Sequence, residues 1–306
     1  MRVLVTGGSG FVGQHLLRNL SEHGHEVTSW GLNDGSAGST TRVDLRDADT
    51  LLEFDLTRLD AVIHLAGLAQ VANSFDQPAD YISTNAGMQV NLMEALLRQE
   101  SFPRVLVIST GGVYRSGLDL ITETSPTAAS NPYVISKLTQ ELLGAYYANR
   151  GFEVLIARPF NHIGPGQQPG YLVSDLASQI ATLERTGGGT VSVGNLESER
   201  DYTDVRDVVA AYRCLMTDGH PGETYNVCSG ISRIGTELFE RLSALASVPI
   251  SSATKNSLRR PIDANQCRAS NEKIQLDTGW RPTVSLDATL LDTLTYWRSQ
   301  QQTDVP

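Results

Sequence analysis

The sequence contains few cysteines, no excess of positive charge and no long apolar run, and each shortage excludes a class of protein. Its three cysteines are far apart and odd in number, which indicates neither a disulfide framework nor a CxxC metal motif and favours a reducing cytoplasm. The formal net charge of −10 argues against a nucleic-acid surface, which is normally basic. No apolar run approaches the ~18 residues of a membrane helix. We therefore expect a cytoplasmic protein with no nucleic-acid or membrane partner.

The sequence also shows no metal-ligand motif and no signal segment. The six histidines show no spacing such as HExxH, so we predict no metal site. The first residues, MRVLVTGG, indicate a strand that runs into a glycine turn. What the chain does have is length. Its 306 residues, 40% hydrophobic and 19% charged, are enough for one large α/β domain or two linked ones.

Short β-branched runs alternate with amphipathic stretches in the first half, which is typical of a parallel sheet covered on both faces. We predict strands at 2–6, 27–30, 61–65, 104–108, 154–157, 190–193 and 224–227. We predict helices at 11–23, 85–98, 133–149, 171–184, 205–217, 236–246 and 286–300, and a loop at 161–170. The expected fold is therefore α/β, a Rossmann-type doubly wound parallel sheet with a smaller C-terminal domain.

Residues 6–13, TGGSGFVG, form a glycine-rich turn between a predicted strand and a predicted helix. In this context the string is the fingerprint of a dinucleotide site. Gly7 and Gly10 would let the backbone approach a pyrophosphate, and Gly13 would let the helix pack closely on the strand. The phosphates would then bind amide groups at the helix N-terminus. The alternative is a plain turn in another doubly wound fold.

The second strand decides between NAD and NADP, because an acidic residue at its end would bind the ribose of NAD. This strand ends at Trp30-Gly31 without a carboxylate. Asp34 lies slightly beyond it, either as a ribose ligand or as a turn residue. Arg42 would hold a 2′-phosphate unless it is a solvated loop arginine, and Asp44 is a candidate for the adenine edge. The balance slightly favours NADP(H), with NAD(H) as the alternative.

Tyr133 and Lys137 are four residues apart on a predicted helix, so both side chains lie on one face. An ammonium near a phenol favours the phenolate, and we expect Lys137 to lower the pKa of Tyr133 and make it an acid–base group. The strand at 104–108 leads into Ser109 and Thr110. Hydroxyls at this end of a parallel strand point into the crevice where such sheets bind ligands.

Together, TGGSGFVG, Thr110 ahead of Val113-Tyr114, and Tyr133-xxx-Lys137 resemble the extended short-chain dehydrogenase/reductase family over nearly the whole chain. The resemblance implies that Tyr133 is the general acid–base, that Lys137 binds the nicotinamide ribose, and that Thr110 binds the substrate oxygen, with Ser109 as the fallback. Asn85 resembles a helix residue near the central strands, unless it is a helix cap. The cofactor contacts that the resemblance implies are Gly7, Gly10, Phe11, Val12, Gly13, Arg42, Asp44, Leu45, Leu65, Ala66, Gly67, Asn85, Tyr133, Lys137, Pro159, Phe160 and His162.

The second half resembles family members that act on nucleotide-diphosphate sugars, and most of all the reductases of GDP-4-keto-6-deoxy-D-mannose. This likeness lies in RPFNHIGPGQ at 158–167, in ERDYTDV at 199–205 and in RRPID at 259–263. It implies reduction at C4 to a product such as GDP-D-rhamnose. Each arginine has a surface ion pair as its alternative. The implied substrate contacts are Asn161, Val173, Ser174, Arg200, Arg260 and Asp263.

The resemblance also implies two domains and a homodimer. Residues 1–164 and 203–230 would form the NAD(P)-binding domain, and residues 165–202 and 231–306 the nucleotide-sugar-binding domain. The helices at 85–98 and 133–149 would pair with those of a second copy in a four-helix bundle.

Three other functions are alternatives to reduction. A 4,6-dehydratase of this family carries Asp-Glu directly after the catalytic threonine, where this chain has Gly111 and Gly112. A 4-epimerase with tightly held NAD needs no such pair and is the main alternative. A dinucleotide-sensing module would have no need of Thr110, Tyr133 and Lys137. Consumption of the cofactor separates reduction from the last two, because a reductase consumes it, an epimerase regenerates it and a sensor only binds it.

Overall fold

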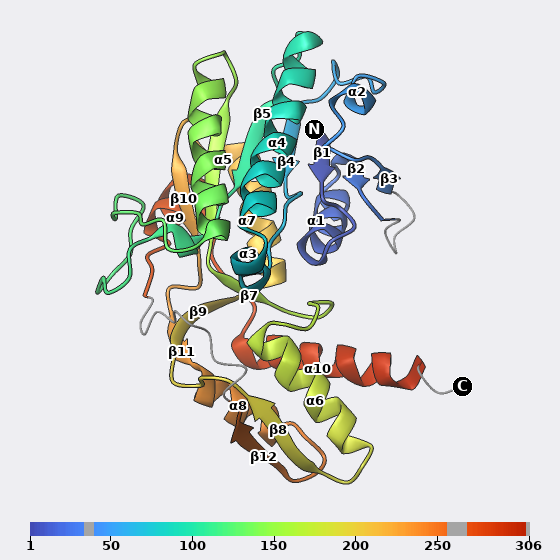
Figure 1. Cartoon of the computed structure of the whole chain (residues 1–306), viewed down its shortest axis with the longest axis vertical. Helices are drawn as coiled ribbons and strands as arrows, with labels where there is room; N and C mark the ends of the chain where they lie inside the picture. The colour runs from blue at the N-terminus through green and yellow to red at the C-terminus, as the bar shows by residue number, and fades with distance from the viewer. Residues whose placement is uncertain (34–39, 256–267, 304–306) are drawn as a thin grey trace.

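A seven-stranded parallel sheet forms the larger part of the molecule (Figure 1). The computed structural model describes residues 1–33, 40–255 and 268–303, with side chains up to residue 301. Every neighbouring pair in the sheet is parallel, which confirms the predicted doubly wound architecture. The spatial order is β10 (Thr224–Val227), β6 (Val154–Pro159), β5 (Arg104–Ile108), β4 (Ala61–His64), β1 (Arg2–Thr6), β2 (Glu26–Gly31) and β3 (Thr40–Arg42).

Helices cover both faces of this sheet because successive strand residues point to opposite sides. Val3 and Val5 on β1 belong to one core cluster with α1 (Phe11–Glu22), α7 (Val205–Asp218) and α9 (Glu272–Thr278). Leu4, between them, belongs to the other cluster with α2 (Ala48–Leu51), α4 (Pro78–Arg98) and α5 (Pro132–Ala148). The apolar runs in the sequence thus supply two cores. Ile274 and Trp280 pack into the first of them, and the predicted division of the chain into two domains stays a prediction.

A smaller group of elements lies beyond one end of the large sheet, in the lower half of Figure 1. It has its own hydrophobic cluster, with fully buried side chains such as Leu176, Leu238 and Leu290. Its helices are α6 (Leu172–Glu184), α8 (Gly235–Ala244) and α10 (Leu286–Thr303). Its strands are β8 (Gly189–Val193) paired with β12 (Ile250–Thr254), and the three-stranded sheet β11 (Ser232–Ile234), β9 (Glu199–Asp204) and β7 (Asn161–Ile163).

Two of the secondary-structure predictions are wrong, one in each part of the molecule. Residues 161–163 were expected in a loop but form β7, which pairs with β9. The partner strand β9 was not predicted either. Its inward-facing residues, Asp201 and Thr203, are buried polar groups, so the alternation of apolar residues that marks a strand is absent. Helix α4 begins at Pro78 instead of residue 85, with a proline in its first turn. None of the described helices is apolar and long enough to cross a membrane.

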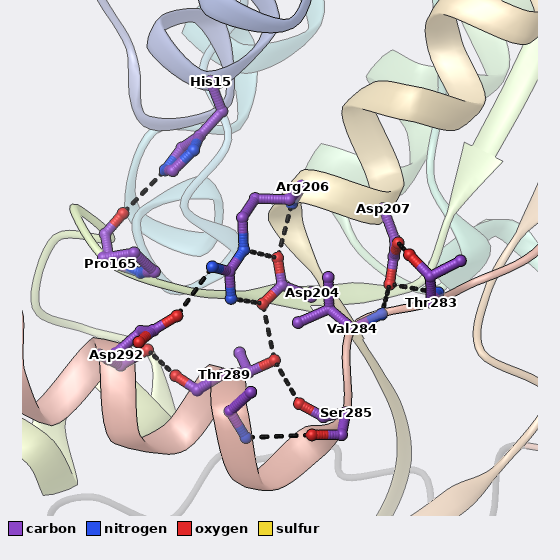
Figure 2. A network of polar contacts seen from close by, with 12 residues as sticks. His15, Pro165, Asp204, Arg206, Asp207, Thr283, Val284, Ser285, Thr289 and Asp292 are labelled. Carbon is purple, nitrogen blue, oxygen red and sulfur yellow. Dashed lines mark hydrogen bonds and ion pairs between the residues drawn. The ribbon is translucent and has the colours of Figure 1, made fainter.

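A polar network joins the start of α7 to the C-terminal segment (Figure 2). The Arg206 guanidinium donates to both oxygens of the Asp204 carboxylate, at 2.9 and 2.7 Å, and to Asp292 on α10 at 2.7 Å. Asp204 is fully buried and also accepts from Thr289 on α10. Asp207 accepts from the backbone amides of residues 283 and 284. These bonds fix the smaller group of elements against the helix that follows β9.

Candidate active site

The strand order reverses beside β1, which pairs with β2 on one side and with β4 on the other. In open α/β sheets a ligand binds in the crevice at the carboxyl ends of the strands at such a switch point. Thr6 and His64 end the two strands, and Thr6 Oγ1 lies 2.8 Å from His64 Nδ1. Burial lowers the pKa of His64 to about 3, so the imidazole is neutral. His64 is thus hydrogen-bonded at Nδ1, while its Nε2 has no hydrogen-bond partner among the described residues.

The glycine turn after β1 is packed too closely for side chains. Gly7 has φ +73°, and a Cβ there would lie 2.8 Å from the Ala66 amide nitrogen. A Cβ on Gly13 would lie 2.3 Å from the Gly7 carbonyl oxygen. The turn closes with a hydrogen bond from the Gly10 amide to the Gly7 carbonyl at 3.0 Å. Glycine at these positions is therefore required by packing as well as by ligand approach.

The start of α1 fits the phosphates of a dinucleotide. No side chain caps this helix, which begins at Phe11 and continues through Val12, so its first amide groups have no intrahelical acceptor. Such a terminus attracts anions. The loop after β4, formed by Leu65, Ala66 and Gly67, lies directly against the turn through the Gly7–Ala66 contact. The residues present thus fit the cofactor that the sequence predicts.

Three charged side chains lie beyond the ends of β2 and β3. Arg42 is exposed and pairs in register with Gly31, where a Cβ would meet Ser9 Oγ at 2.6 Å. The Asp44 carboxylate accepts from Arg46 at 2.9 and 2.6 Å, and this bond lowers the pKa of Asp44. Leu45, next to it, is buried. Arg46 was missed by the sequence analysis, and Asp34 lies outside the described residues.

Tyr133 lies at the first turn of α5 and is hydrogen-bonded to Thr110. Burial raises the pKa of Tyr133, and the bond with Thr110 opposes this shift. The expected lowering of this pKa by Lys137 is therefore wrong in direction, because the desolvation of the phenolate outweighs the other effects. Tyr81 and Tyr171, which the sequence analysis missed, lie close enough to raise it further.

Lys137 is buried beside this pair, with its Nζ 6.0 Å from the centre of the Tyr133 ring. Nζ donates to the Ile108 carbonyl at 2.9 Å and to Gln140 Oε1 at 2.8 Å. Burial lowers the pKa of Lys137 to about 8. Gln140 was also missed, although its spacing of three from Lys137 places it on the same face of the helix.

Asn85 lies in the interior of α4, so it is not a helix cap. Its side chain is completely buried and accepts from the Leu68 amide at 2.7 Å. It also donates to the Leu68 carbonyl and, at 2.9 Å, to Ser136 Oγ on α5. Asn85 therefore holds the loop after β4 against the helix that carries Tyr133 and Lys137. Ser109, the fallback for Thr110, instead donates to Glu141.

Phe160 fills the space above Gly111. A Cβ on Gly111 would lie 2.8 Å from the Phe160 ring, which is buried next to Pro159 at the end of β6. The His162 ring stacks on Phe11, the first residue of α1, with ring centres 6.1 Å apart. The segment after β6 thus touches both α1 and the turn after β5, and the cofactor contacts of Phe160 and His162 stay predictions.

The predicted substrate residues fall into three groups. Asn161 and Arg200 lie on the paired strands β7 and β9, and Asn161 Nδ2 donates to the Asp201 carbonyl at 3.4 Å. Val173 and Ser174 are completely buried, and Ser174 Oγ donates to the Gln167 carbonyl, so both have a packing role and we leave them out of the substrate site proposed below. Arg260 and Asp263 lie outside the described residues.

Comparison with known proteins gives close matches over the full length. The profile of the NAD dependent epimerase/dehydratase family matches residues 3–228. The chain is 36% identical to GDP-6-deoxy-D-mannose reductase of Pseudomonas aeruginosa over 98% of both proteins. It resembles the structure of RMD from Pseudomonas aeruginosa complexed with NADPH, with a TM-score of 0.88, 34% identity and coverage of 98% and 99%. It also resembles the UDP-glucose 4-epimerase of Thermus thermophilus in complex with NAD, with a TM-score of 0.84, 28% identity and coverage of 97% and 99%.

The packing of Phe160 on Gly111 predicts different effects for two adjacent glycines. Gly111→Ala should lower the free energy of unfolding by about 1–3 kcal/mol, because the Phe160 ring must move. Gly112→Ala is the matched control, since a Cβ there meets its nearest atom at 3.4 Å. It should change stability by less than about 0.5 kcal/mol. Urea unfolding measures both, and equal costs would contradict the packing argument.

Proposed function

The chain belongs to the NAD dependent epimerase/dehydratase family, and from this premise we propose that it reduces the C4 keto group of GDP-4-keto-6-deoxy-D-mannose to give GDP-D-rhamnose. The observation that carries the proposal is the hydrogen bond between the partly buried residues Thr110 and Tyr133, with the buried Lys137 beside it at the switch point of the sheet. The similarity to a GDP-6-deoxy-D-mannose reductase over 98% of both chains supports the choice of substrate.

Tyr133 is proposed as the proton donor. When bound, the reduced nicotinamide supplies a hydride to C4, and the carbonyl oxygen must then gain a proton. The raised pKa of Tyr133 keeps its phenol protonated near neutral pH, so the group holds the proton that this oxygen needs. Thr110, already hydrogen-bonded to Tyr133, is placed to donate to the same oxygen as negative charge develops on it.

Lys137 is proposed to bind the nicotinamide ribose. It is a buried amine with only two hydrogen-bond acceptors among the described residues, so one of its three N–H groups is free to donate to a ligand. Its charge also favours the phenolate that Tyr133 becomes after proton transfer. Asn85 supports this placement by tying α4 to α5 through Ser136.

A 4,6-dehydratase activity is disfavoured by the packing after β5. Elimination of water needs an additional acid and base, and the family places them directly after the threonine. At Gly111 the Phe160 ring occupies the space that a side chain would need. An acidic residue therefore does not fit this position without movement of Phe160.

A nucleotide-sugar 4-epimerase with tightly held NAD is the second candidate. The similarity to a UDP-glucose 4-epimerase structure with a TM-score of 0.84 favours it. The same Tyr133, Lys137 and Thr110 would serve it, since epimerisation also moves a proton and a hydride at C4. The two reactions differ in whether the cofactor is consumed.

Asn161 and Arg200 are proposed to bind the sugar diphosphate. The planar guanidinium of Arg200 matches phosphate oxygens, and β9 carries it close to Asn161 on β7. Arg260 and Asp263 complete the proposed nucleotide site by family resemblance. Guanine is favoured as the base because of the similarity to the GDP-sugar reductase.

NADP(H) is proposed as the preferred cofactor, with NAD(H) as the alternative. The end of β2 has Gly31 in place of an acidic residue, and Ser9 occupies the space of its missing side chain. Arg46 and Arg42 bring positive charge to this end of the sheet, and both lower the pKa of Asp44. A 2′-phosphate is favoured by such a pair, and the similarity to a structure with bound NADPH agrees with it.

The protein is further proposed to be a cytoplasmic homodimer. Leu142 and Tyr146 lie one helical turn apart on α5 and are 73% and 52% exposed, so they form an exposed apolar pair on one face of the helix. On the neighbouring α4 a Cβ at Gly87 would meet nothing within 4 Å. A second copy would cover this surface by pairing α4 and α5 with its own two helices.

Tyr133→Phe should lower turnover of GDP-4-keto-6-deoxy-D-mannose by ~10²–10⁴-fold, because the proton donor is lost. Affinity for NADPH should be unchanged. The loss of NADPH absorbance measures turnover, and nucleotide fluorescence measures binding. Tyr296→Phe on α10 is the control and should keep full activity. A fully active Tyr133→Phe would refute the acid–base assignment.

Arg200→Ala should raise the KM for the GDP-sugar by roughly 10-fold or more, because a charged hydrogen bond to phosphate contributes about 1.5–3 kcal/mol. The dissociation constant of NADPH should stay the same. Arg185→Ala, at the exposed end of α6, is the control for loss of one surface arginine. An unchanged KM in Arg200→Ala would remove Arg200 from the diphosphate site.

Sedimentation equilibrium of the purified protein should give the mass of two chains. Leu142→Glu places a charge in the proposed interface and should give the mass of one chain at micromolar concentration. Leu276→Glu, at the exposed Leu276 on α9, is the matched control and should remain a dimer. A monomeric wild-type protein would contradict the proposed assembly.

A further inference from the structure

A second buried ionic group lies one helical turn beyond Lys137, and the roles proposed above leave it unused. The Glu141 carboxylate on α5 accepts from Arg158 on β6 at 2.9 Å from Nε and 2.6 Å from Nη2. The same carboxylate accepts from Ser109 Oγ at 2.5 Å. The exposed fractions of the Arg158 and Glu141 side chains are only 9% and 13%. This cluster therefore joins α5, β5 and β6 directly beneath the candidate site.

Glu141 is connected through Ser109 to both Lys137 and Thr110. Ser109 lies between Ile108, whose carbonyl accepts from Lys137, and Thr110, which is bonded to Tyr133. The bond from Ser109 to Glu141 thus fixes the end of β5 on which both contacts depend. The negative charge of Glu141 also raises the pKa of Lys137, against the larger lowering by burial.

We propose that Glu141 is a positioning residue, which keeps the Lys137 ammonium charged and fixes the segment that carries Thr110. This role rests on the proposed function, because a charged Lys137 is what the nicotinamide ribose and Tyr133 require. A buried ammonium has a large desolvation cost, and a fixed carboxylate one turn away offsets part of it.

The other groups that face Lys137 do not supply this compensation. Tyr133, on its own helix, is a protonated phenol near neutral pH. His64 from β4 is neutral, and its pKa is lowered partly by Lys137 itself. From α4 the neighbouring side chain is the neutral Asn85, and from β5 it is the Ile108 carbonyl. Arg158 from β6 is positive. Among the described groups, Glu141 supplies the negative charge that acts on Lys137.

The composition of the chain makes this charge measurable. The whole sequence has three lysines, Lys137, Lys255 and Lys273. Protein labelled with lysine carrying ¹³C at Cε therefore gives three side-chain signals, and the one missing from Lys137→Arg belongs to Lys137. Titration of this signal reports the ionisation of Lys137 without substrate, cofactor or turnover.

Glu141→Gln keeps the size of the side chain and removes its charge. The pKa of Lys137, about 8 in the wild type, should fall by roughly 1 unit, because the attraction of the Glu141 carboxylate is lost. NADPH binding should then weaken at lower pH than in the wild type as pH rises. The matched control is Glu184→Gln, which breaks the Glu184–Arg298 pair in the smaller group of elements. It should leave the Lys137 titration unchanged.

Breaking a buried pair can prevent folding, so a second variant is included. Glu141→Gln with Arg158→Met removes both charges and leaves none uncompensated. The proposal predicts a lowered Lys137 pKa in this variant also. An unchanged Lys137 titration in either folded variant, or an equal shift in Glu184→Gln, would overturn it. A wild-type protein that reduces no GDP-sugar would instead count against the proposed function and would leave the Lys137 comparison intact.

Discussion

The candidate site depends on the burial of one ammonium group, that of Lys137. A charge removed from water is costly unless fixed polar groups replace its solvent. Here the replacement comes from the Ile108 carbonyl, from Gln140 and from the field of Glu141. Gln140 in turn donates to the Asn85 carbonyl on α4, and Gln89 on α4 donates to the Gln140 carbonyl. The packing of α4 on α5 is therefore part of the arrangement that keeps Lys137 in place.

A second constraint is the close approach of backbone segments at the switch point. The turn after β1, the loop after β4 and the segment after β6 meet with little free space, as the contacts at Gly7, Gly13 and Gly111 show. Gly7 lets the turn lie against the loop after β4, Gly13 lets α1 pack against the turn, and Gly111 admits the Phe160 ring. The crowding by Phe160 thus leaves no room for an acidic side chain at Gly111, the first of the two positions at which a dehydratase carries its acidic pair.

Much of the part of the molecule built on the seven-stranded sheet could be predicted from the sequence, because its physical signals are local. Apolar runs with intervening glycines located β1, the turn and α1, and the four-residue spacing placed Tyr133 and Lys137 on one face of α5. The smaller group of elements was harder to predict. β9 buries Asp201 and Thr203, and its partners β7 and β11 have three residues each, so no periodic pattern marks them. Ser174 was predicted as a substrate contact from the family resemblance, but its side chain is completely buried and packs inside the protein.

The pKa of Tyr133 shows the limit of arguments from spacing. A neighbouring ammonium and a buried environment shift a phenol in opposite directions, and the sequence contains the first effect but not the extent of the second. The same holds for Glu141, whose partner Arg158 is recognisable only when α5 and β6 are placed in space. Residue type predicts which groups can exchange a proton, and tertiary packing decides whether their pKa values rise or fall.

Transfer of deuterium from [4,4-²H₂]NADPH to GDP-4-keto-6-deoxy-D-mannose tests the central claim most directly. The account predicts that one equivalent of NADPH is oxidised for each sugar converted and that the deuterium is found at C4 of the product. A protein that leaves NADPH and the keto sugar unchanged, but inverts C4 of a GDP-hexose with its bound NAD and without net oxidation, would contradict the reductase and establish the epimerase.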